Sequence, residues 1–177
     1  MIHEWGIDHH YFTGCMQPIF EKMAMPFKRY YVDLLGMGQS TSGTVKNADD
    51  IVEVLVAFMK EVIGEQPVWL IGNSFGGLIS CGIAQKAKSL VKGMILLAPT
   101  TGCKKRTLPK QGVWKKDERW FSQLSQVEQE DFAFTNAVLT KESWQVFDKF
   151  IYPAVLKQKD STYLNQILDG TLSVNLY

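Results

Sequence analysis

The chain has 177 residues, of which 46% are hydrophobic and 21% charged, and its formal net charge is +1 at neutral pH. This length suits one domain that carries an insertion, and the composition is that of an ordinary globular protein. A charge so close to zero argues against a nucleic-acid partner, and no apolar run is long enough to span a bilayer. The cysteines form no C-x-x-C pair and leave an odd thiol, and the start shows no secretory leader, so we expect a cytoplasmic protein.

The first part of the chain predicts a strand, a loop and a helix, in that order. Residues 30–32 form a short β-prone run, and residues 33–40 follow it as a loop with two glycines. Asn47 can cap a helix in which apolar residues recur at helical spacing, and Gly64 ends that pattern.

Two further strands are predicted on either side of a second helix. The apolar run at residues 68–71 resembles a strand buried on both faces of a parallel sheet. A helix over about residues 75–87 and a strand over residues 94–97 follow. Because strands alternate with helices, we expect right-handed crossovers and a parallel sheet of the α/β class.

The pattern changes after Pro99. A lysine-rich stretch over residues 103–119 contains acidic residues and lacks interleaved stacking aromatics, so it predicts a solvated loop rather than a nucleic-acid-binding patch. Beyond it, Ser125, Thr140 and Asp160 are placed to cap three helices. The expected domains are therefore a partial α/β core over residues 1–102, an aromatic-rich, all-helical cap over residues 103–170, and the start of a return to the core over residues 171–177.

The most informative motif is the pentapeptide over residues 72–76, which reads G-x-S-x-G. It lies between a predicted strand and a predicted helix, which is the setting of a nucleophile elbow, and it nominates Ser74 as the attacking hydroxyl. Gly72 and Gly76 leave room where strand and helix crowd the turn, and Asn73 completes the motif before the serine. A phosphate-binding loop is a weaker interpretation, because the Lys-Ser/Thr ending of a P-loop is missing.

Three blocks together resemble the α/β-hydrolase superfamily, in the form that carries a helical cap. Residues 3–6, His-Glu-Trp-Gly, resemble the H-G-x-G oxyanion segment of that family, and residues 33–40 resemble its D-x-x-G-x-G-x-S loop. The elbow over residues 72–77 is the third block. The order and spacing of the blocks make the resemblance specific over about the first hundred residues.

The resemblance implies a serine hydrolase acting on an ester, thioester, amide or activated carbon–carbon bond, with no cofactor and no metal, and the aromatic cap favours a small, apolar substrate. It implies an oxyanion hole made by the backbone N–H groups of Trp5 and Phe75, in a loop supported by His3 and Gly6. Glu4 departs from the family pattern, which has glycine there, so either the loop is tightened or a carboxylate lies beside it.

The general base is the missing part of this pattern. A serine nucleophile needs a base, yet His3, His9 and His10 all precede Ser74, whereas the fold supplies its histidine after the serine. We therefore expect the triad aspartate and histidine to lie outside this sequence, which would then be a partial chain. Two alternatives stay open: a non-catalytic binding or interaction protein, and a chain completed by a partner subunit.

Overall fold

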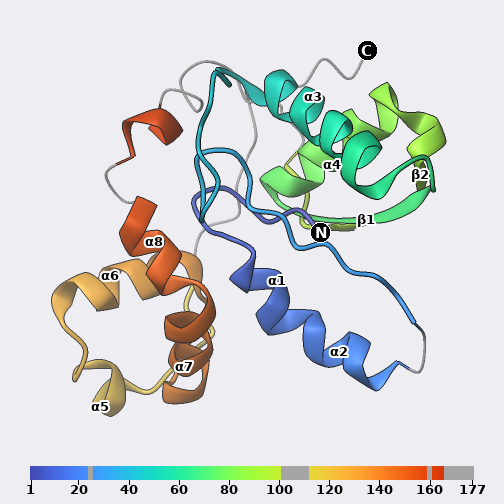
Figure 1. Cartoon of the computed structure of the whole chain (residues 1–177). Helices are drawn as coiled ribbons and strands as arrows, with labels where there is room; N and C mark the ends of the chain where they lie inside the picture. Colours follow the sequence, from blue (N-terminus) through green and yellow to red (C-terminus); the bar gives the residue numbers. More distant parts are fainter. Residues whose placement is uncertain (24–25, 101–111, 159–160, 166–177) are drawn as a thin grey trace.

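The computed structural model describes residues 1–23, 26–100, 112–158 and 161–165 (Figure 1). The elements before residue 101 are α1 (His10–Cys15), α2 (Gln17–Lys22), α3 (Ala48–Phe58), η1 (Met59–Ile63), β1 (Val68–Asn73), α4 (Phe75–Lys86), η2 (Lys88–Leu90) and β2 (Val91–Leu97). Those after residue 111 are β3 (Lys115–Lys116), α5 (Glu118–Phe121), α6 (Gln126–Thr135), β4 (Val138–Leu139), α7 (Lys141–Phe150) and α8 (Tyr152–Gln158).

A parallel sheet organises the first half, as predicted. β1 and β2 pair in parallel from Val68 opposite Val91 to Asn73 opposite Leu97. Ile2 forms parallel bridges with both Val32 and Gly72, so the start of the chain lies between two otherwise separate strand segments. The run at residues 30–32 was predicted as a strand but contributes a bridge at Val32 alone in the described structure.

Helix α4 packs on this sheet and α3 packs against α4, and residues of both helices belong to the larger hydrophobic core (Figure 1). The N-cap prediction for α3 is confirmed, because the Asn47 side chain accepts a hydrogen bond from the Asp50 N–H at 2.9 Å. Ile51 in α3 and Ile79 in α4 are fully buried in the core that joins them. This packing supports the turn that connects β1 to α4.

The second half has its own aromatic core. Phe132 is completely buried there, and its ring contacts those of Phe121, Trp144 and Phe147. Ser125 and Thr140 cap α6 and α7 as predicted, and each forms a capping box, with Glu128 and Ser143 respectively.

The prediction that this second half is all helical was wrong in one detail. Lys115–Lys116 and Val138–Leu139 pair as the short parallel strands β3 and β4. Strands of two residues are too short to show an alternating pattern. The proposed cap on Asp160, most of the lysine-rich stretch and both expected domain boundaries lie outside the described residues.

The two halves meet where α1 lies against α7 (Figure 1). Gly14 of α1 allows this approach, because a Cβ there would lie 2.6 Å from the Phe150 ring. No described helix is both long and apolar enough to cross a membrane.

Candidate active site

Ser74 occupies the sharp turn between β1 and α4. Its φ of 47° and ψ of −112° are strained for a residue with a side chain. The Ser74 N–H donates to the Leu97 carbonyl at 2.9 Å, and the Ser74 carbonyl accepts from the Thr100 N–H at 3.0 Å. These bonds to the end of β2 and the residues after it hold the turn in its strained form.

The glycines of the motif are required by crowding at this turn. A Cβ at position 72 would lie 2.5 Å from both the Gly76 carbonyl oxygen and the Ser80 Oγ. A Cβ at position 76 would overlap the Ile2 and His3 carbonyl oxygens and lie 2.6 Å from the Ile2 carbonyl carbon. The start of α4 therefore lies directly against the segment that leads into the expected oxyanion loop.

Trp5 and Phe75 lie side by side at this junction. Their rings make an edge contact with centroids 4.9 Å apart. In the described part of the chain, the backbone N–H groups of Trp5 and Phe75 have no hydrogen-bond partner. Unpaired N–H groups beside a serine, one of them at the positive end of the α4 dipole, are able to bind a developing oxyanion.

His3 is buried beneath the loop. Its Nε2 accepts a hydrogen bond from the Leu34 N–H at 3.0 Å, and its Nδ1 lies 2.7 Å from the Glu4 carbonyl oxygen. Burial lowers the pKa of His3, which favours the neutral ring. These contacts fit a supporting role for His3, and Gly6 follows with a φ of 74° that glycine adopts without strain.

Asp33 organises the loop over residues 33–40. Its carboxylate accepts from the Gln39 N–H at 3.0 Å, from the His9 N–H at 2.8 Å and from the His9 ring at 2.8 Å. Burial would raise the pKa of Asp33, but these hydrogen bonds outweigh burial and lower it.

All three histidines of the chain have partners other than Ser74. His9 pairs with Asp33, and the His10 Nδ1 lies 2.9 Å from the Asp8 carboxylate. Asp8, His9 and His10 are also the one group of three metal-ligating side chains gathered in the described structure. The Nδ1 atoms of the two rings are already engaged, His10 by Asp8 and His9 by Asp33.

The partner of the Ser74 hydroxyl is a residue that the sequence motifs did not identify. Thr100 Oγ1 lies 3.3 Å from Ser74 Oγ. Thr100 follows β2, and the carboxyl ends of neighbouring parallel strands meet at one edge of a sheet. That rule could have identified Thr100 as a residue near Ser74. The left-handed φ of 41° at Ala98, between β2 and Thr100, is not indicated by any sequence pattern.

Glu4 contacts the elbow directly, which answers the question left by its departure from the family pattern. The Asn73 amide donates to the Glu4 Oε2 at 3.0 Å and so links the loop to the residue before Ser74. Burial raises the pKa of Glu4, and the hydrogen bond from Asn73 lowers it by a smaller amount.

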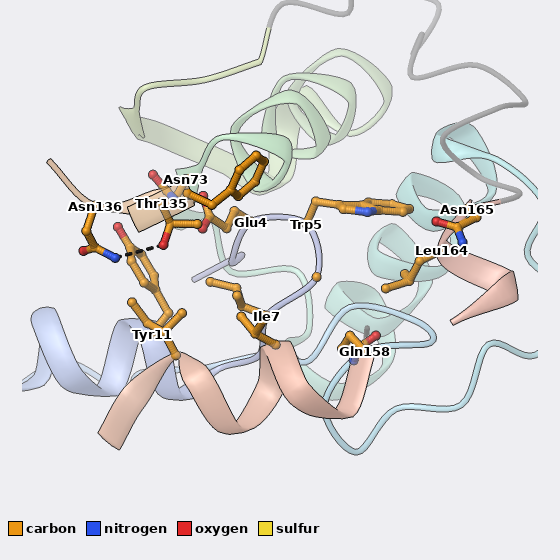
Figure 2. A pocket seen from close by; sticks show the side chains of 14 residues that line it. Glu4, Trp5, Ile7, Tyr11, Asn73, Thr135, Asn136, Gln158, Leu164 and Asn165 are labelled. Atoms are coloured by element: carbon orange, nitrogen blue, oxygen red, sulfur yellow. Dashed lines mark hydrogen bonds between the residues drawn. The ribbon is translucent and has the colours of Figure 1, made fainter. Parts of the chain in front are cut away.

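A cavity of about 530 Å³ lies beside this link and is walled by both halves of the molecule (Figure 2). Ser74 itself is not among its lining residues, but Asn73, which precedes it, and Trp5, which contacts Phe75, are. The wall contributed by the first half contains Glu4, Trp5, Gly6, Ile7, Tyr11 and Asn73. The opposite wall contains Phe134, Thr135, Asn136, Ile151, Val155, Gln158, Leu164 and Asn165. A volume of this size is typical of small-molecule sites.

Comparison with known proteins gives a consistent result. A family model described as the alpha/beta hydrolase fold matches residues 3–150. A solved alpha/beta superfamily hydrolase from Oenococcus oeni has a TM-score of 0.85 at 24% identity, covering 98% of this chain and 64% of that one. A putative lipase from Acinetobacter baumannii has a TM-score of 0.58 at 17% identity.

Similar curated proteins are named pimeloyl-acyl-carrier-protein methyl ester esterases. The one from Aliivibrio salmonicida is 30% identical over 135 residues, covering 76% of this chain and 47% of the relative. The one from Yersinia enterocolitica is 28% identical over 98 residues, covering 55% of this chain and 34% of the relative. The chain thus spans a third to a half of the length of these relatives.

Proposed function

The chain belongs to the alpha/beta hydrolase fold family, and from this premise we propose that it carries the nucleophilic half of a serine hydrolase. The substrate is an ester, thioester, amide or activated carbon–carbon compound that is small and mainly apolar. Esters are favoured, because the similar curated proteins are named as esterases. The observation that carries the proposal is the strained backbone of Ser74 at the start of α4, beside two N–H groups that have no partner among the described residues.

The proposed reaction follows from these positions. A base removes the proton from Ser74 Oγ as the oxygen attacks the substrate carbonyl carbon. The negative charge that forms on the carbonyl oxygen is held by the N–H groups of Trp5 and Phe75, aided by the dipole of α4. The alcohol or other leaving group departs with a proton from the base, and water then releases the acyl group from Ser74 by the same steps in reverse.

The base is the part that the described histidines do not supply. His3, His9 and His10 each have another partner, and Thr100 occupies the position beside Ser74 Oγ. We propose that the catalytic imidazole comes from outside these residues, and that Thr100 orients the serine hydroxyl.

We further propose that the core ends near residue 102 and that a cap follows to about residue 170, so that the cavity lies between core and cap. The apolar side chains Ile7, Ile151 and Val155 on its walls support an apolar acyl group. The odd cysteine count favours a reducing compartment, for which we propose the cytoplasm.

Rescue with free imidazole tests this function. We expect the 177-residue chain to hydrolyse p-nitrophenyl butyrate slowly, and imidazole to raise the rate above that of imidazole alone. The Ser74→Ala variant should lose this enhancement, whereas Ser122→Ala, which removes an exposed hydroxyl, should keep it. Equal enhancement in Ser74→Ala and the unmodified chain would contradict the proposal and favour a non-catalytic binding protein.

A further inference from the structure

The lining of the cavity beside the elbow is acidic rather than basic. Its lining residues include no lysine, arginine or histidine, and Glu4 is the acidic residue among them. Tyr11, another lining residue, stays neutral at ordinary pH because burial raises its pKa to about 12. An ionised Glu4 would therefore give the described walls a net negative charge.

Glu4 lacks a cationic partner in the described part of the chain. Its Oε2 accepts one hydrogen bond from the neutral Asn73 amide, and no described residue bonds to its Oε1. No described lysine, arginine or histidine side chain forms an ion pair with it. A partly buried carboxylate without a counter-charge is unfavourable, and a cation that entered the cavity would relieve that cost.

Aromatic rings line the same cavity. Trp5 and Tyr11 both line it, and in the view of Figure 2 the Tyr11 ring lies on one side of Glu4 and the Trp5 indole on the other. The faces of such rings attract organic cations, with tryptophan the strongest. Carboxylate and aromatic groups together are the chemistry that recognises an ammonium group.

We propose that Glu4, Trp5 and Tyr11 together bind an organic ammonium group on the substrate. Glu4 is then a specificity-determining residue. This inference rests on the proposed hydrolase function and narrows its substrate class to esters that carry a cationic group near the scissile carbonyl. Carboxylate-bearing substrates are disfavoured, because they would place a second negative charge beside Glu4.

A binding measurement without chemistry tests this inference. The ligands are butyrylcholine and 3,3-dimethylbutyl butyrate, which have the same shape but differ by the replacement of the quaternary nitrogen with carbon. Their dissociation constants are measured by NMR titration at about pH 8 in the Ser74→Ala background, where neither ester is cleaved by that serine. We expect the cationic ester to bind about tenfold more tightly than the neutral one.

The matched variant is Glu4→Gln in the same background, because glutamine can still accept the hydrogen bond from Asn73. It should bind both esters with the affinity of the neutral one, while Glu65→Gln, the same change at an exposed site, should keep the preference. Equal binding of the two esters before Glu4 is changed, or no binding of either, would overturn the inference. A preference that survives in a folded Glu4→Gln variant would overturn it as well. Because no turnover is measured, these outcomes are independent of the hydrolysis test.

Discussion

Replacing Gly76 with alanine should destabilise the junction between the elbow and the oxyanion loop. The new Cβ would lie 2.6 Å from the Ile2 carbonyl carbon and would overlap the carbonyl oxygens of Ile2 and His3. Normal carbon–carbon contact is about 3.5–4.0 Å, so the Ile2–His3 backbone must move by roughly 1 Å.

The cost can be worked from the bonds that this movement strains. The Ile2 N–H donates to the Ile71 carbonyl at 2.8 Å, and the Ile2 carbonyl accepts from the Asn73 N–H at 3.1 Å. Two such bonds are worth about 1–3 kcal/mol together, and overpacking adds about 1–3 kcal/mol. Alanine recovers about 1 kcal/mol through its helix propensity, which leaves a net loss of about 3 kcal/mol.

Urea unfolding monitored by tryptophan fluorescence measures this loss. The control is Gly112→Ala, where the added Cβ meets nothing within 4 Å and stability should change by less than about 0.5 kcal/mol. Hydrogen exchange of the Asn73 amide should also accelerate in Gly76→Ala. If the two variants were equally stable, the account of the elbow glycine would be refuted.

Three other substitutions test the site and its supports. Ser74→Gly should raise the unfolding free energy by about 1 kcal/mol in urea titrations, because glycine adopts the φ of 47° without strain; a loss of stability would contradict that strain. Asp33→Asn should cost about 2 kcal/mol near neutral pH, because it weakens hydrogen bonds to a charged acceptor. Because the pKa of Asp33 is lowered in the folded chain, the ionised carboxylate stabilises the fold. This contribution to stability is complete above the unfolded-state pKa and is lost as the pH falls through the folded-state pKa. Melting curves of this variant and the unmodified chain should therefore converge in acid, and a constant gap would contradict the assignment. Phe132→Ala should cost about 4 kcal/mol by loss of a fully buried ring, whereas Phe134→Ala, at an exposed position, should cost far less in the same melts.

The fold was predictable where the constraint is local in sequence. The turn at Ser74 needs glycines within two residues on either side, and the helix after Asn47 combines a cap with apolar spacing, so both patterns can be read from short segments.

The long-range contacts of the site were not predictable in this way. The bond between Glu4 and Asn73 joins residues 69 positions apart, and the contact between Ser74 and Thr100 depends on the backbone geometry of Ala98. Neither residue pair has a sequence spacing that a motif could encode, because the sheet and its connections bring them together.

Covalent labelling shows whether Ser74 is the nucleophile of this chain. The 177-residue chain is treated with a fluorophosphonate in the presence of free imidazole, digested, and mapped by mass spectrometry. We expect one phosphonylated site, Ser74, with labelling that depends on imidazole and disappears in Ser74→Ala. Modification at another residue, or no modification of a folded chain at saturating imidazole, would contradict the assignment of Ser74 as the nucleophile.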